Sequence, residues 1–170
     1  QVANTDHNLI LSAPTASGKT EAAFIPALNS VEDWDTGLKV LYISPLKALI
    51  NDQFQRISEL SEYLDIPITR WHGEVSQAQK RKVVNQPKGV LLITPESIEG
   101  MLVNRPGEAQ HLFKGVEWII IDELHSFLGT ERGIHLQSLL QRISQFMQEP
   151  RFIAMSATLN KKDFGYAKAF

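Results

Sequence analysis

Short apolar runs recur along the 170-residue chain, and most of them are apolar at every position, many with β-branched side chains. Continuous apolarity is typical of strands that are buried on both faces, as in a parallel sheet covered by helices. The pattern predicts strands at Leu9 to Leu11, Val40 to Ile43, Ile68 to Trp71, Val90 to Ile93, Trp118 to Ile121 and Phe152 to Met155.

The stretches between these runs have a helical period, because apolar residues recur there at i, i+3, i+4 and i+7. The two clearest sets are Leu46, Leu49, Ile50, Phe54, Ile57 and Leu64, and then Leu136, Leu139, Leu140, Ile143 and Met147. Residues 33–37 and 104–108 are predicted to be surface turns. Alternating strands and helices predict an α/β fold, a three-layer sandwich in which helices cover both faces of a mostly parallel sheet. Such a fold binds ligands at the carboxyl ends of its strands.

Composition fits one domain, residues 1–170, because 43% apolar residues suffice for a sizeable core. The net charge of −2 provides no global basic field, so nucleic-acid binding would need a few well-placed cations. The absence of cysteine excludes disulfides and cysteine metal sites and fits a reducing compartment. No apolar run approaches the ~20 residues that span a bilayer, so we expect a cytoplasmic protein without a membrane partner.

A loop between the first strand and the following helix has the composition of a phosphate-binding loop. It reads Ala13, Pro14, Thr15, Ala16, Ser17, Gly18, Lys19 and Thr20. The N–H groups of such a loop and the N-terminus of its helix bind a polyphosphate. Lys19 is predicted to reach the β- and γ-phosphates, and the Thr20 hydroxyl to bind Mg²⁺. Ala13 stands where the G-x-x-x-x-G-K-[ST] pattern has its first glycine, so a simple turn that opens a helix is the alternative.

Two acids, Asp122 and Glu123, follow the apolar strand 118–121 directly. Carboxylates at the end of a buried strand need a positive partner. Asp122 is therefore predicted to hold Mg²⁺, and Glu123 to orient or deprotonate the water that attacks the γ-phosphate. We expect the acids and Lys19 to face one another across neighbouring strand ends. Alternatively, both acids merely begin the next loop.

Hydroxyl residues precede proline after two other strands, at Ser44-Pro45 and Thr94-Pro95. Each hydroxyl is predicted to cap a helix whose first residue is the proline, leaving N–H groups that point outward. A row of such helix ends could hold successive phosphates of a nucleic-acid strand, with Lys47 adding charge. Plain helix capping is the alternative.

Three further polar residues lie near the predicted nucleotide edge. His125 could sense the γ-phosphate region, or it could be a satisfied loop histidine. Ser156 and Thr158 could hydrogen-bond the acidic strand end, or they could cap a helix that starts near Lys161.

Together these stretches resemble motifs I, Ia, Ib, II and III of superfamily-two DNA and RNA helicases, in order and over nearly the whole chain. The matching residues are 13–20, 44–49, 94–97, 122–125 and 156–158. Residues 122–125, Asp-Glu-Leu-His, are similar to the DExH subtype. Three stretches further resemble the large helicase-related proteins of that superfamily: 44–49 followed by Asp52, 71–74, and 131–136.

The resemblance implies a first RecA-like domain of the P-loop NTPase type, from a longer protein that also carries a second RecA-like domain. Such a domain binds ATP with Mg²⁺ and a single-stranded tract of DNA or RNA, and it couples hydrolysis to movement or unwinding. By this resemblance, hydrolysis depends on Lys19, Thr20, Asp122 and Glu123. Coupling depends on His125, Ser156 and Thr158. The nucleic-acid backbone lies along Pro45, Lys47, Gly73, Thr94 and Arg132, although each of these also has a plain structural use.

In this family ATP lies between the two RecA-like domains, and the second domain supplies arginines to the γ-phosphate. Residues 1–170 alone are therefore expected to bind Mg-ATP weakly and to hydrolyse it negligibly. The family often has glycine at the place of Ala16, and a left-handed conformation there would cost ~1 kcal/mol.

Other classes remain open on the sequence. A duplex translocase of the restriction or remodelling type would share motifs I to III. A small-molecule kinase or GTPase would carry an arginine-rich lid or an N-K-x-D motif, and the chain has neither. An inactive docking domain would be expected to lack Lys19, Asp122 or Glu123.

Overall fold

The computed structural model describes residues 8–14, 18–61, 65–159, 163, 165 and 167. A single sheet of six strands forms its centre, in the order β1-β6-β5-β2-β4-β3, and all neighbouring strands are parallel. Every predicted strand is confirmed. The bounds are β1 Leu9–Ser12, β2 Gly37–Ile43, β3 Ile68–Trp71, β4 Lys88–Ile93, β5 Trp118–Ile121 and β6 Arg151–Ser156.

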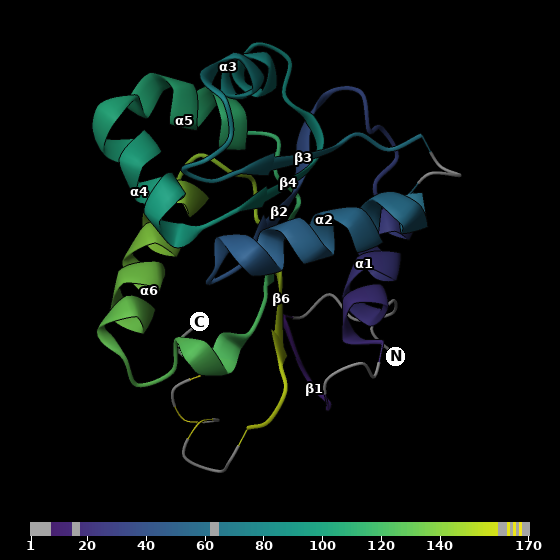
Figure 1. Cartoon of the computed structure of the whole chain (residues 1–170), viewed down its shortest axis with the longest axis vertical. Helices are drawn as coiled ribbons and strands as arrows, with labels where there is room; N and C mark the ends of the chain where they lie inside the picture. The colour runs from purple at the N-terminus through teal and green to yellow at the C-terminus, as the bar shows by residue number, and fades with distance from the viewer. Residues whose placement is uncertain are drawn as a thin grey trace.

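Helices cover both faces of this sheet (Figure 1). Helices α1 and α2 lie on one face, and α4, α5 and α6 lie on the other. Their bounds are α1 Lys19–Ser30, α2 Lys47–Ser61, α3 Gln77–Asn85, α4 Pro95–Asn104, α5 Pro106–Phe113 and α6 Glu131–Ser144, with a short 3₁₀ helix, η3, at Leu124–Ser126. The predicted three-layer sandwich is therefore confirmed.

Strand β2 shows why the strands are apolar throughout. Its Val40 and Tyr42 pack in the core beneath α1 and α2, whereas Leu41 and Ile43 pack in the core beneath α4, α5 and α6. Successive side chains of a strand point to opposite faces, so a sheet with two covered faces buries every residue. All four side chains are fully buried.

The helix predicted from residue 46 differs in detail. Leu46 precedes α2, which begins at Lys47, and its side chain is 56% exposed. It does not join Ile50 and Ile57 in the core, and Leu64 lies outside the described residues. The turn predicted at 104–108 is also wrong, because α5 begins at Pro106. Proline suits the first helical position since its fixed φ is helical and its missing N–H has no partner there.

The two predicted proline caps have different outcomes. Thr94 caps α4 as predicted, with the Ser97 N–H donating to its hydroxyl at 3.3 Å and Pro95 at the first helical position. Ser44 does not cap a helix at Pro45, because α2 begins only at Lys47. The Ser44 N–H donates to Ile93 O at 3.1 Å. Its buried hydroxyl has no hydrogen-bond partner among the described residues.

Within the described ranges, no helix is both long enough and apolar enough to cross a membrane.

Candidate functional site

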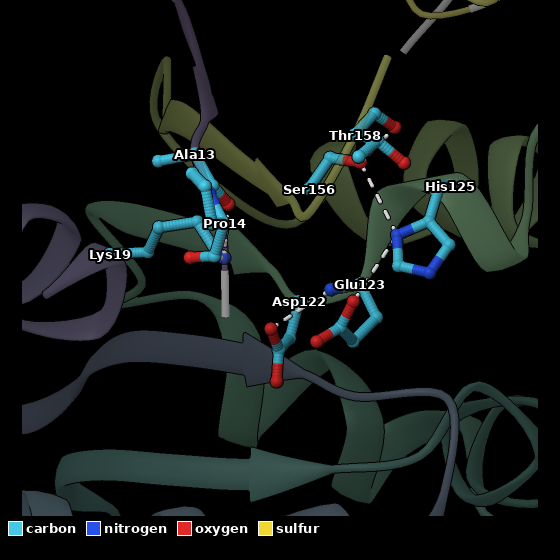
Figure 2. Close-up of polar contacts among 8 residues, drawn as sticks. All are labelled: Ala13, Pro14, Lys19, Asp122, Glu123, His125, Ser156 and Thr158. Atoms are coloured by element: carbon cyan, nitrogen blue, oxygen red, sulfur yellow. Dashed lines mark hydrogen bonds and ion pairs between the residues drawn. The ribbon is translucent and has the colours of Figure 1, made fainter. Parts of the chain in front are cut away.

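The predicted nucleotide residues meet at the carboxyl edge of the sheet. Figure 2 shows Lys19 on one side of this edge, Asp122 and Glu123 facing it, and His125 beside Glu123. The expectation that neighbouring strands carry them is wrong, because β6 lies between β1 and β5. The loop after β1 and the acids after β5 therefore face one another across the end of β6.

The described part of the phosphate-binding loop folds around its own lysine. Lys19 Nζ donates to Ala13 O at 2.5 Å and to Pro14 O at 2.8 Å. Gly18 has φ 80 and precedes α1, a left-handed conformation that glycine adopts without strain. Residues 15–17, three of the predicted phosphate contacts, lie outside the described residues.

The first turn of α1 is tied to α2 by polar contacts that the sequence did not reveal. Thr20 is buried, and its hydroxyl donates to Gln53 Oε1 at 3.2 Å. Arg56 donates from Nε and Nη2 to Glu21 Oε1, at 2.9 and 2.5 Å. Burial raises the pKa of Glu21, but its backbone hydrogen bond and Arg56 outweigh burial, so that pKa lies below its ordinary value.

Asp122 is a buried carboxyl, with only 5% of the residue exposed. Burial is the largest cause that raises its pKa, and the Glu123 charge adds to it, whereas the Lys19 charge opposes it. The Glu123 N–H donates to its Oδ1 at 2.9 Å. The fully buried Tyr42 hydroxyl lies near this carboxyl without forming a hydrogen bond among the described residues. Burial, followed by the Asp122 charge, raises the pKa of Tyr42.

Glu123 adopts a left-handed backbone conformation, with φ 47 and ψ 46. Such a conformation is uncommon outside glycine and costs of order 1 kcal/mol. Glu123 follows Asp122, the first residue after β5, and its carboxylate lies beside His125, whose Nδ1 is 3.2 Å from Glu123 Oε2.

His125 links Glu123 to the end of β6. Ser156 Oγ lies 3.3 Å from His125 Nδ1, and the same hydroxyl donates to Thr158 O at 3.1 Å. A hydroxyl has one proton, so Ser156 accepts from His125, and we assign a proton to Nδ1. The side chain of Thr158 is exposed, and its carbonyl rather than its hydroxyl takes part.

Comparison with known proteins shows the family of the chain. A family model described as DEAD/DEAH box helicase matches residues 1–164. The chain belongs to the DEAD/DEAH box helicase family. The Lys19 loop and the acids at 122 and 123 lie within the matched range, and their role in nucleotide binding stays a prediction.

Individual relatives of the chain are also helicases. ATP-dependent helicase Lhr-Core of Saccharolobus solfataricus is 32% identical over 171 residues, covering 91% of this chain and 19% of the relative. Lhr helicase/uracil glycosylase of Escherichia coli is 35% identical over 182 residues, covering 92% of this chain and 11% of the relative. The structure of Mycobacterium smegmatis helicase Lhr bound to ssDNA and AMP-PNP matches with a TM-score of 0.79 at 32% identity. The match covers 92% of this chain and 21% of the related chain.

These matches confirm the resemblance to large helicase-related proteins and the RecA-like fold. This DEAD/DEAH box domain spans about a fifth of the length of these relatives, or less.

Arg132 joins two of the predicted nucleic-acid segments of this helicase domain. Its Nη2 donates to Pro45 O at 2.9 Å and to Glu96 Oε1 at 2.7 Å, and its guanidinium lies 5.5 Å from the Phe127 ring centroid. Pro45 follows β2, and Glu96 lies in the first turn of α4. Arg132 therefore has a structural use at the edge where nucleic-acid contact is predicted.

The other predicted nucleic-acid residues lie after the ends of β2, β3 and β4. Lys47 pairs with Glu74, and both side chains are more than half exposed. Gly73 is exposed, whereas Thr94 is buried and its hydroxyl is occupied by the α4 cap. Their contact with nucleic acid stays a prediction.

The donor set suits magnesium. Thr20 contributes a hydroxyl and Asp122 a carboxylate, both hard oxygen ligands. The described residues contain no group of three or more histidine, cysteine or acidic side chains that could enclose a metal ion. Mg²⁺ fits such an incomplete set, because it keeps several waters and binds one or two carboxylates together with substrate phosphates.

Proposed function

We propose that this chain is the ATP-binding and hydrolysing motor domain of a nucleic-acid-dependent helicase. It couples Mg-ATP hydrolysis to movement on, or unwinding of, DNA or RNA. The observation that carries the proposal is the convergence of Lys19, Asp122 and Glu123 at one edge of the sheet (Figure 2).

Lys19 is held by two backbone carbonyls, which γ- and β-phosphate oxygens can replace as acceptors. Its ammonium then neutralises charge that develops on the transferred group. Thr20 and Asp122 would hold Mg²⁺, which supplies charge neutralisation at the β- and γ-phosphate oxygens when bound. A negatively charged Asp122 gains most from such a partner, because it is buried.

Glu123 is the group that orients the attacking water and accepts its proton. His125 Nδ1 lies 3.2 Å from Glu123 Oε2 and 3.3 Å from Ser156 Oγ. Glu123, His125 and the end of β6 thereby form one connected unit. This unit would couple the state of the γ-phosphate to the loop that follows β6.

The partners of the domain are a single-stranded tract of DNA or RNA and a second RecA-like domain that completes the ATP site. The ssDNA and AMP-PNP in the related Mycobacterium smegmatis structure support the first partner. Without arginines from a second domain, residues 1–170 alone should hydrolyse ATP negligibly, since such arginines contribute ~10³ to 10⁵ in rate. Strand displacement by the full-length protein would separate a helicase from a duplex translocase.

Glu123→Gln tests the role of the catalytic base. In the full-length protein it should leave nucleotide binding nearly unchanged and slow ATP turnover by about two orders of magnitude or more. Glu32→Gln is the matched control, because Glu32 is an exposed loop residue. This variant should hydrolyse ATP at the wild-type rate. Wild-type turnover in Glu123→Gln would remove Glu123 from the mechanism.

The nucleic-acid edge has its own test. Lys47→Ala and Thr94→Val should each weaken binding of single-stranded nucleic acid at fixed salt, and Lys47→Ala should reduce the salt dependence by about one counterion. Lys114→Ala removes an exposed lysine after α5 and should leave affinity unchanged. Equal affinity in all three variants would exclude this edge as the binding surface.

A further inference from the structure

The proposed metal ligand Thr20 makes a contact that the family motifs do not explain. Its hydroxyl donates to the amide oxygen of Gln53, a residue in the middle of α2, at 3.2 Å. The contact is partly buried and joins residues 33 positions apart, so it depends on how α1 and α2 pack. We propose that Gln53 is a positioning residue that keeps Thr20 oriented as a ligand of Mg²⁺, an inference that rests on the proposed function.

The chemistry of the hydroxyl supports this assignment. A threonine hydroxyl has one proton and two lone pairs, and a metal ion binds only a lone pair. When the proton is directed to Gln53 Oε1, it points away from the cation and both lone pairs remain for binding. Without an acceptor at this place, the side chain could rotate to another staggered position or direct its proton toward the metal.

A neutral acceptor has an advantage over a charged one here. Asp122 already provides a buried carboxyl group at the proposed site. A carboxylate at position 53 would add another negative charge and could compete with Thr20 and Asp122 for the cation. The amide of Gln53 accepts the Thr20 proton without adding charge. The carboxylate of Asp52, the residue before Gln53, is exposed to solvent.

A second contact holds Gln53 at this distance. Arg56, one turn after Gln53 on α2, donates twice to Glu21, the residue after Thr20 on α1. Residues three apart on a helix share a face, so two adjacent residues of α1 meet one face of α2. The Glu21–Arg56 pair thereby fixes the separation at which the Thr20–Gln53 hydrogen bond forms.

The experiment measures the Mg²⁺-dependent gain in affinity for a fluorescent ADP analogue, as the ratio of the dissociation constants in EDTA and in Mg²⁺. Gln53→Leu removes the acceptor at nearly constant volume. Groups that orient a metal ligand typically contribute 10–100-fold to metal affinity, so we expect the gain to fall by about 10-fold. Affinity in EDTA should stay at the wild-type value, because no metal is bound there.

Further variants complete the design. Gln53→Glu keeps an acceptor oxygen but adds a negative charge, so its Mg²⁺-dependent gain should lie between those of Gln53→Leu and the wild type. Gln55→Leu is the matched control, because Gln55 lies on the same helix, is exposed and donates a hydrogen bond to Glu59. It should behave as the wild type. If the leucine variant at 53 does not fold, Gln53→Met gives the same measurement with an unbranched side chain.

The outcomes separate this inference from the proposed function. An unchanged Mg²⁺-dependent gain in Gln53→Leu would overturn the inference and leave the proposed function intact. An equal loss in EDTA and in Mg²⁺ would also overturn it, because it would show that Gln53 only supports the packing of α1. A wild-type protein whose nucleotide affinity does not respond to Mg²⁺ would contradict the proposed function itself.

Discussion

Asp122 and Glu99 are two carboxylates of one domain in opposite surroundings. Glu99 lies between α4 and α6, where its Oε2 accepts from Arg142 Nη1 at 2.8 Å and from His135 Nε2 at 3.2 Å. The Arg142 hydrogen bond is the main cause that holds its pKa below the ordinary value. Asp122 is more deeply buried and forms no ion pair among the described residues, and Lys19 is bonded to backbone carbonyls.

The two residues therefore act on stability with opposite signs. The charged form of a carboxylate is more stable in the folded chain than in water when it accepts hydrogen bonds from cations. It is less stable in the folded chain when burial removes its water and no cation replaces it. Glu99 strengthens the packing of α4 on α6. Burial disfavours the charged form of Asp122 in the folded chain, and the Mg²⁺ that we propose as its partner would relieve that cost. Three substitutions test this comparison.

Lys19→Ala should have the largest effect. It removes the one charge that lowers the pKa of Asp122 and the donor proposed for the phosphates. Charged hydrogen bonds contribute about 1.5–3 kcal/mol, so nucleotide affinity should fall by about 10- to 100-fold. Isothermal titration with ADP and Mg²⁺ measures this change, and Lys114→Ala serves as the control. Equal affinities would show that Lys19 does not contact phosphate.

Asp122→Asn should stabilise the nucleotide-free domain at pH 7 by about 0.5–2 kcal/mol, because it removes a carboxyl group whose burial is unfavourable. Gains of this size are typical when a destabilising residue of a functional site is replaced. The raised pKa of Asp122 means that the wild type loses stability as pH rises from the ordinary value of 3.8 through the folded value. The variant escapes that loss, so its advantage should disappear below pH 3.8. Urea unfolding at both pH values measures it. Asp52→Asn, at an exposed position, should show no such advantage.

Glu99→Gln should have the smallest effect and the opposite sign. It should destabilise the domain at pH 7 by about 1 kcal/mol, because the Arg142 and His135 contacts are half exposed and only partly desolvated. The lowered pKa of Glu99 contributes stability above its ordinary value of 4.5, which is lost as pH falls through the folded value. The difference should vanish in acid. Glu108→Gln, in the exposed pair with Arg105, should change stability less. A gain at pH 7 would contradict the comparison.

The strands of the sheet and the two acids of the candidate site could be predicted from the sequence, for physical reasons. Strands that are buried on both faces must be apolar throughout, which made β2, β4 and β5 recognisable. Two acids directly after such a strand stand out because burial of charge is costly, and this located Asp122 and Glu123.

The unpredicted contacts depend on strand order and helix packing. The strand order decides that β6 lies between the loop after β1 and the acids after β5, and no periodicity encodes it. Gln53 looks like an ordinary polar residue of an amphipathic helix until α1 is packed against it. Tyr42 looks like any core residue of β2, although its hydroxyl lies near Asp122. The predicted Ser44 cap was wrong because the helix begins at Lys47 rather than at Pro45.

Arg132 has a mechanical consequence. One guanidinium on α6 joins the carbonyl that follows β2 to the first turn of α4. The two hydrogen bonds of this side chain favour one common position of the three segments. A nucleic-acid strand bound here, as we propose, would therefore contact them as one unit.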